Sequence, residues 1–198
     1  MGMDVHGINP KQNKSIENYP LLKQVKELER QEAWKQRSRL LDDVGMDVYW
    51  AERDEYEGKN KGIYFRNNCW WWRPLWNYCR VVAPDLIDRD LFDSGHNNSG
   101  AGLDDKGAKE LGKRLLAEIN NSNTIQYQAS YQQYLDDLPD DDCMRCNNNN
   151  HGHNKKRECT NCKKTGKSTN FNKSYPFDID NVREFAEFCL QSGGFEIC

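Results

Sequence analysis

The sequence has few apolar residues and no long apolar run. Hydrophobic residues make up 36% of the 198 residues, and mean hydropathy is −1.02. No stretch approaches the roughly 20 consecutive apolar residues that cross a bilayer, so we expect no membrane-spanning segment. The first residues also lack the basic and apolar regions of a secretory signal. These two absences predict a cytoplasmic protein, in which the eight cysteines are thiols and metal ligands rather than disulfides.

An excess of basic charge is also missing. The chain has 28 Lys and Arg against 31 Asp and Glu, which gives a formal charge of −3. A protein that coats nucleic acid without sequence preference needs a broad basic surface, so this function class is excluded. Aliphatic residues are scarce, and we therefore expect a core that depends on the six Trp, nine Tyr and seven Phe.

The residue pattern predicts an α+β fold: a small, mostly helical domain with a few short strands and an inserted zinc ribbon. Periodic apolar positions predict helices over 17–43, 124–138 and 180–191, and a further helix that starts near Asp104 with Asp104 or Asp105 as its cap. Short strands are expected around Met3 and Val5, over 62–67, and as an edge strand over 195–198. We predict a main domain of 1–139 plus 176–198, with 17–58 as a helical insertion and 140–175 as the zinc ribbon. The narrow apolar stripe of 17–43 either packs on its own domain or supports a homodimer.

Four cysteines carry the plainest chemical signal. Cys143 and Cys146 form one C-x-x-C pair, Cys159 and Cys162 form a second, and twelve residues separate the pairs. Each pair places two thiolates on one tight turn, and two such turns suit a tetrahedral Zn²⁺ site. Segment 140–175 is too polar to order itself by burial, so metal ligation is expected to supply its stability. Four thiolates close the coordination shell, which indicates a structural role rather than hydrolysis, although His151 and His153 could replace a cysteine.

Two further segments contain candidate ligand-binding residues. The run over 62–79 interleaves aromatic residues with arginines, which can stack a purine or hold a phosphate; alternatively, its tryptophans form the core. The glycine-rich loop over 93–102 precedes a helix N-terminus, where free backbone N–H groups can receive an anion; alternatively, it is a surface turn. The candidate residues are Tyr64, Arg66, Asn67, Trp70, Trp72, Arg73, Trp76, His96, Asn97 and Asp104. No pattern assigns a catalytic residue.

Four segments together resemble an uncharacterised family of small proteins from bacteriophages and bacteria. The matching residues are Gly2 to Gly7 (GMDV-x-G), Lys61 to Cys79 (KG-x-YFRNN-x-WWWRPLW-x-YC), Gly95 to Asp104, and Asn181 to Cys198 (ending in SGGFEIC). The cysteine pairs in that family look similar to the C-x-x-C-x-G-x-G knuckles of the DnaJ zinc module. The present chain departs from this pattern because Asn147 to Asn150 follow the first pair without a glycine. The resemblance implies a phage-type origin, with the host cytoplasm as location, and a bound metal, but no reaction.

These observations predict a non-enzymatic binding protein that engages a host protein or sequesters a small anionic or nucleotide ligand, in a counter-defence or host-takeover role. One alternative is a nucleic-acid-associated zinc-ribbon accessory protein, because the cysteine segment is locally basic, with Lys155, Lys156, Arg157, Lys163, Lys164 and Lys167. A second alternative is a nucleotide-processing enzyme that uses His96 as acid or base.

Overall fold

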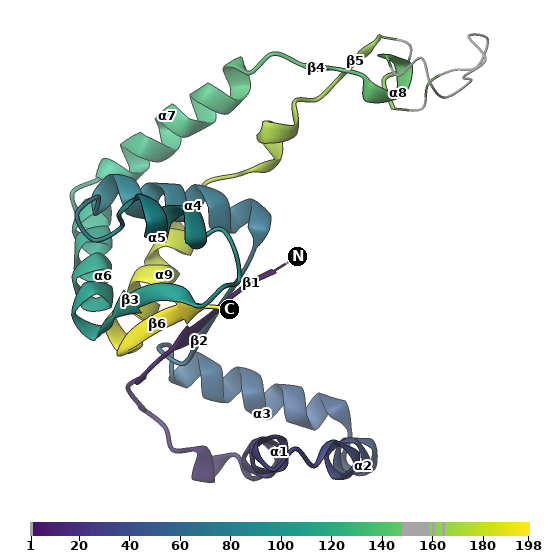
Figure 1. The fold of residues 1–198 in the computed structure, drawn as a ribbon, viewed down its shortest axis with the longest axis vertical. Helices are drawn as coiled ribbons and strands as arrows, with labels where there is room; N and C mark the ends of the chain where they lie inside the picture. The colour runs from purple at the N-terminus through teal and green to yellow at the C-terminus, as the bar shows by residue number, and fades with distance from the viewer. Residues whose placement is uncertain (1, 148–158, 160, 164) are drawn as a thin grey trace.

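The computed structural model describes residues 2–147, 159, 161–163 and 165–198 as an α+β protein of helices and short antiparallel strands (Figure 1). The helices are α1 (Pro20–Arg30), α2 (Trp34–Val44), α3 (Met46–Lys59), α4 (Cys69–Val82), α5 (Arg89–Ser94), α6 (Asp105–Asn120), α7 (Asn123–Asp137), α8 (Met144–Asn147) and α9 (Ile179–Gln191), with 3₁₀ turns η1 (Ile16–Asn18) and η2 (Phe171–Ser174). The strands are β1 (Gly2–Gly7), β2 (Tyr64–Asn68), β3 (Ala101–Asp104), β4 (Asp141–Asp142), β5 (Lys167–Ser168) and β6 (Gly194–Ile197).

A four-stranded antiparallel sheet in the order β2-β1-β6-β3 organises the central domain. β6 pairs with β1 on one side, where Val5 lies opposite Ile197, and with β3 on the other, where Leu103 lies opposite Phe195. The C-terminal segment was predicted as an edge strand, and this prediction is wrong: β6 is an inner strand. Its buried Phe195 and Ile197 fit this position, because an inner strand is protected on both edges.

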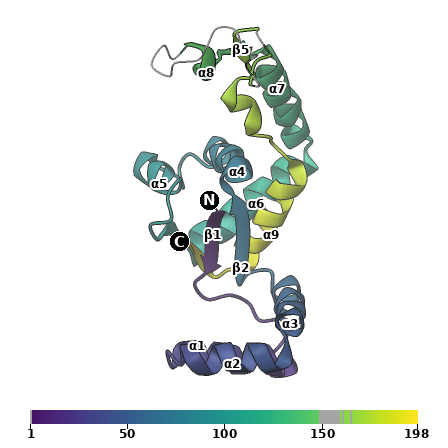
Figure 2. The same cartoon turned by 90° about the vertical axis from the view of Figure 1, so that its right-hand side faces the viewer.

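One face of the sheet and three helices form the main core. Side chains alternate along the strands, so that Met3 and Val5 point inward while Asp4 faces outward. Helices α4, α6 and α9 cover the inner face (Figure 2). The largest fully buried side chains of this cluster are Trp72, Trp76, Phe185, Phe188 and Phe195. The core is thus built from aromatic residues, as the composition predicts.

Helix α4 contains most of the tryptophan run. Asn68 caps it, because its side chain accepts hydrogen bonds from the backbone N–H groups of Trp70 and Trp71. Pro74 lies inside this helix. The rings of Trp72 and Trp76 stack with centroids 5.4 Å apart. Each indole N–H is satisfied by a backbone carbonyl, that of Gly95 for Trp72 and that of Phe92 for Trp76.

A helical unit lies between β1 and β2 in the sequence and has its own small apolar cluster. The buried residues of this cluster are Tyr19, Leu21, Leu22, Val25, Leu41, Tyr49 and Tyr56. The predicted single helix over 17–43 is wrong, because the chain reverses between α1 and α2 with Glu32 at a positive φ of 54°. This reversal lets Leu41 fold back onto the cluster of α1. The buried Asn60 side chain ties the unit to the chain before it, accepting from the backbone N–H groups of Asn13 and Lys14.

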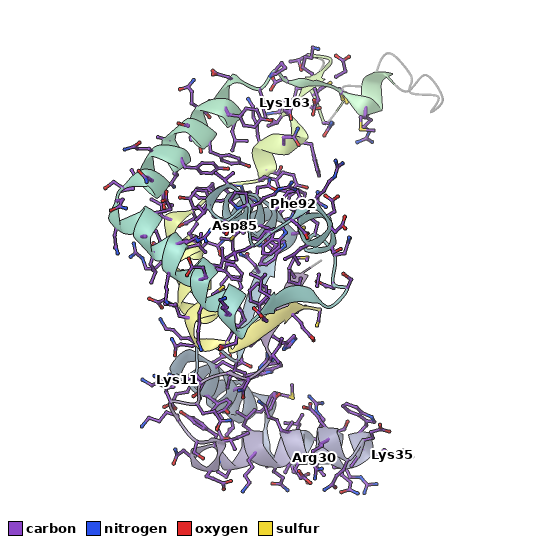
Figure 3. The ribbon with its side chains drawn as sticks, turned by 60° about the vertical axis from the view of Figure 1, so that its left-hand side comes forward. Lys11, Arg30, Lys35, Asp85, Phe92 and Lys163 are labelled. Carbon is purple, nitrogen blue, oxygen red and sulfur yellow. The ribbon has the colours of Figure 1, made fainter. Side chains whose placement is uncertain are left out.

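The segment between α7 and α9 extends away from the central domain. Helix α7 leads outward to β4, α8 and β5, and the chain returns through η2, at the end of the molecule opposite α1 and α2 (Figure 1). In Figure 3, Lys163 lies at this end, while Arg30 and Lys35 lie at the other. We call α7 together with residues 138–178 the arm. Within the described part of the chain, none of the helices combines the length and hydropathy that a bilayer crossing requires.

Candidate metal centre

Short local elements position the cysteines at the end of the arm. Strands β4 and β5 pair antiparallel, with Asp142 opposite Lys167, and their side chains form an ion pair of 2.6 Å. Immediately after β4, the backbone N–H of Cys143 donates to the carbonyl of Gly166 over 2.8 Å. Gly166 has a φ of +72°, a conformation that glycine adopts without strain. This hairpin therefore places Cys143 beside the turn that contains the second cysteine pair.

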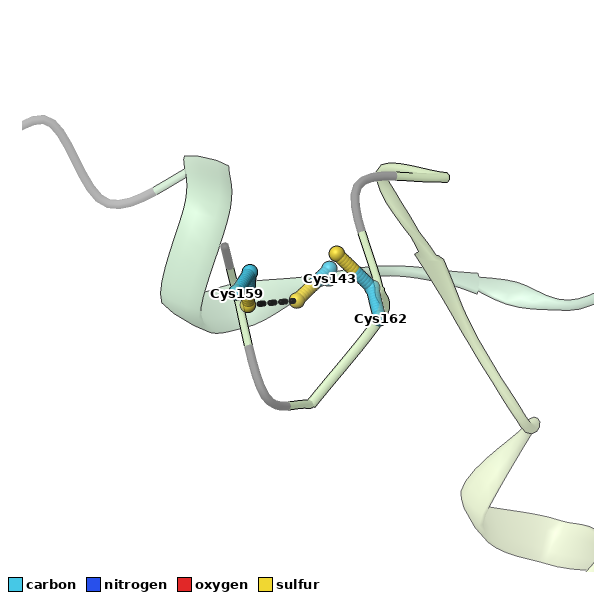
Figure 4. A group of neighbouring side chains, drawn as sticks. All are labelled: Cys143, Cys159 and Cys162. Carbon is cyan, nitrogen blue, oxygen red and sulfur yellow. Dashed lines mark hydrogen bonds between the residues drawn. The ribbon is translucent and has the colours of Figure 1, made fainter. Parts of the chain in front are cut away.

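Three cysteine sulfurs converge at this point (Figure 4). The Sγ atoms of Cys143, Cys159 and Cys162 all lie within 4.8 Å of one another, and those of Cys143 and Cys159 are 3.9 Å apart. Zn–S bonds of about 2.3 Å in a tetrahedron give S···S distances of about 3.8 Å. Cys143 and Cys162 are buried although almost everything around them is polar and exposed. The three thiols could hold a metal ion, and their spacing fits one.

The fourth predicted ligand, Cys146, belongs to α8, one helical turn after Cys143. Its side chain lies outside the described residues, and so do His151 and His153, the predicted substitute ligands. The side-chain amide of Asn161 donates to the Cys143 sulfur over 3.5 Å. Such a donor stabilises negative charge on a thiolate and orients it, as outer-shell groups do around metals.

The predicted ligand-binding residues do not form one surface. Trp72 and Trp76 are fully buried and hydrogen-bonded, so they belong to the core and cannot stack a ligand. Asn67 is also buried, and its amide donates to the Asn181 side chain over 2.7 Å. These three residues hold α4, α9 and the sheet together.

Tyr64 and Arg66 point to the opposite face of β2 from the core. The Tyr64 hydroxyl donates to the Asp4 carboxylate, and burial followed by this hydrogen bond raises the Tyr64 pKa to about 12. Both residues line a cleft of about 540 Å³ against α3, where Arg53 lies over the rings of Trp50 and Tyr64. Acidic side chains also line this cleft, and Arg53 is already paired with Glu57 over 2.8 Å. The cleft is therefore of mixed charge and does not favour an anion.

The loop around His96 has a largely structural arrangement. Asp104 caps α6, accepting from the Gly107 N–H over 2.7 Å, as predicted. The exposed Asn97 makes a long contact of 3.5 Å to the Asp93 carbonyl. His96 is half-buried with its ring edge against Phe92, and its Nδ1 finds no partner among the described residues. Burial, with the nearby Arg73 charge, lowers the His96 pKa, so the imidazole is neutral at pH 7.

Trp70 and Arg73 lie where α4 meets η2 and its cap residue Tyr175. The Trp70 ring packs on Tyr175 at 4.9 Å and on Phe171 at 5.3 Å. The Arg73 guanidinium lies over the Tyr175 ring and donates to its hydroxyl over 3.1 Å. Arg73 and Tyr175, together with residues of α7, line a groove of about 250 Å³. Tyr131, Tyr134 and Tyr175 were not among the site residues predicted from the sequence. The helical spacing of Tyr131 and Tyr134 was the available signal, and nothing local in the sequence links them to Arg73.

Comparisons with known proteins add no further constraint. No protein-family model, curated protein or solved structure matches this chain. The convergence of Cys143, Cys159 and Cys162 is the chemical feature that the structure itself provides.

Proposed function

We propose that this protein is a non-enzymatic binding protein whose arm is ordered by a structural Zn²⁺ ion and engages an anionic partner. The observation that carries the proposal is the convergence of three sulfurs within 4.8 Å at the end of the arm. Cys143, Cys159 and Cys162 would hold the ion, with Cys146 as the fourth ligand. When bound, Zn²⁺ would act as a cross-link between the two turns rather than as a Lewis acid, because four thiolates leave no open position.

The choice of Zn²⁺ follows from the ligands. Thiolates are soft donors that favour Zn²⁺, Cu(I) and iron–sulfur clusters over Mg²⁺ or Ca²⁺. Two C-x-x-C pairs that supply four thiolates match the closed sites of structural zinc modules. Of the described residues between 140 and 174, only Cys143 and Cys162 are buried, so little besides a metal can hold this segment in place.

An anionic partner is supported by the distribution of charge. Residues 140–175 contain eight Lys and Arg against four Asp and Glu, whereas the other residues contain 20 and 27. A basic segment in an otherwise acidic chain attracts anions to that segment. This arrangement favours a phosphate-bearing partner, which agrees with the sequence-based expectation of a nucleotide or nucleic-acid ligand. The resemblance to phage proteins supports a role in the host cytoplasm.

Metal analysis and partner capture test the proposal. Protein purified without chelator should contain about one Zn²⁺ per chain, as expected for one tetrahedral site. Zinc-loaded protein should retain nucleotides or oligonucleotides from a host extract, and chelation should release them. Absence of stoichiometric metal would exclude the proposal. Capture that is independent of metal, or capture of a protein alone, would instead favour the host-protein interpretation.

A further inference from the structure

The groove at the base of the arm has the features of a site for a stacked, negatively charged ligand. It lies between α4, α7 and the segment around η2, and its volume is about 250 Å³. Arg73 and Asn77 line it from α4, Tyr131 and Tyr134 from α7, and Tyr175 from the end of η2. Among the described residues, no acidic side chain lines this groove, in contrast to the cleft beside α3.

Arg73 supplies an available positive charge. Its guanidinium donates one hydrogen bond to the neutral Tyr175 hydroxyl and forms no ion pair with any described carboxylate. By contrast, Arg114 on α6 is already ion-paired with both Asp85 and Glu110. An arginine that stacks on a tyrosine ring is held in place while its remaining N–H groups can bind a phosphate.

Tyrosine rings supply the stacking surface. Tyr134 is 54% exposed, and its ring lies 6.2 Å from that of Tyr131. The Tyr131 hydroxyl donates to the Tyr175 carbonyl over 3.0 Å, which fixes the two walls of the groove relative to each other. Beyond Tyr175, the exposed Phe171 ring contacts Trp70 at 5.3 Å and continues the aromatic surface along the arm.

We propose that this groove binds one nucleotide unit, with the base stacked on Tyr134 and the phosphate on Arg73. The inference rests on the proposed function in one respect, since both assign an anionic partner to the arm. Drug-sized ligands occupy roughly 300–1,000 Å³, so a groove slightly below this range suits a single base and its phosphate. The unit belongs either to a free nucleotide or to a single strand that continues over Phe171 toward the basic end of the arm. Stacking on tyrosines combined with a cationic contact is the usual mode for single strands.

Two variants with matched controls test the groove. The probes are a fluorescein-labelled single-stranded oligonucleotide, followed by anisotropy, and AMP, followed by calorimetry. Tyr134→Ala should weaken binding by roughly tenfold, because each stacked base contributes about 1–3 kcal/mol. Arg73→Gln should weaken binding and also reduce the slope of log K against log salt by about 0.7 for the single strand. The controls are Trp34→Ala, an exposed aromatic residue on α2, and Arg66→Gln, an exposed arginine on β2; both should bind like the wild type.

The results separate the sources of the ligand. If the oligonucleotide binds no more tightly than AMP, the natural ligand is a free nucleotide. If the oligonucleotide binds much more tightly than AMP, the natural ligand is a single strand. The inference is overturned if neither probe binds, if Tyr134→Ala has no effect, or if Arg66→Gln weakens binding as much as Arg73→Gln. Near-ultraviolet circular dichroism verifies that each variant keeps the tryptophan core.

The same data distinguish this inference from the proposed function. If the groove variants bind normally while removal of the metal abolishes binding, the groove is not the binding site and the proposed zinc-dependent function is supported. If the protein contains no metal while the groove variants lose binding, the groove is the binding site and the zinc-dependent function is wrong.

Discussion

Replacement of Cys162 by serine should unfold the end of the arm and leave the central domain folded. Structural zinc sites contribute on the order of 10–16 kcal/mol of folding free energy at neutral pH, and loss of a thiolate removes most of it. The described residues from 140 to 174 bury only Cys143 and Cys162, so no apolar core compensates. The central domain keeps its aromatic cluster, which contains none of these residues.

The effect on the central domain can be estimated from the contacts that join it to the arm. If η2 and Tyr175 also detached, the domain would lose the hydrogen bond from Arg73 to the Tyr175 hydroxyl, about 1 kcal/mol, and the Trp70 ring contacts, about 0.5–1.5 kcal/mol. For a chain of this size, each kcal/mol lowers Tm by about 2–4 °C. We therefore expect Tm of the tryptophan core to fall by less than about 10 °C.

Hydrogen exchange with mass spectrometry and near-ultraviolet circular dichroism are the assays. Peptides from 140–147 and 165–174 should lose protection in Cys162→Ser, while peptides from α6 should not. Cys198→Ser, which changes an exposed cysteine outside the cluster, is the control and should match the wild type. Unchanged protection of both arm peptides, or simultaneous loss of protection in α6, would refute the reasoning.

Three further changes test the fold. Gly95→Ala should destabilise the protein by about 1–3 kcal/mol in urea denaturation, because the added Cβ would lie 2.4 Å from Nε1 of the buried Trp76; an unchanged midpoint would contradict the described packing. Asp104→Ala removes the cap of α6 and should cost about 1 kcal/mol, whereas Asp104→Asn should cost much less. Burial raises the Tyr131 pKa to about 12, so the folded state resists its ionisation and stability should fall as pH rises from about 10 to 12. Tyr131→Phe should flatten this decline in alkaline melts, and an identical decline in both proteins would show that other groups cause it.

Elements set by local signals were predictable from the sequence. The start of α6 follows from Asp104, which ends β3 and caps the helix through its own carboxylate. The cap of α9 is harder to place, because Asp178, Asp180 and Asn181 all lie near its start and it is Asp178 that accepts the N-terminal hydrogen bond. Several neighbouring Asp and Asn residues have equal capping ability, and the approach of the preceding chain selects among them.

Elements that depend on distant residues were not predictable. Nothing in residues 31–33 is a glycine or proline, yet α1 ends there because the unit gains burial of Leu41 by folding back. The inner position of β6 depends on β1 and β3, which lie far away in the sequence. The cysteine cluster was visible because spacing alone defines it, whereas the groove brings Arg73 beside Tyr175, a contact that no local pattern encodes.

The place of β6 between β1 and β3 has a consequence for the nascent chain. During synthesis, β1 and β2 can pair early, because only the helical unit separates them. The other edge of β1 must wait until residues 194–197 leave the ribosome. Until then an unpaired strand edge carrying Met3 and Val5 is open to other polypeptides, and contacts of such wide sequence separation form slowly. We therefore expect this protein to depend most on chaperones before residues 194–197 have left the ribosome.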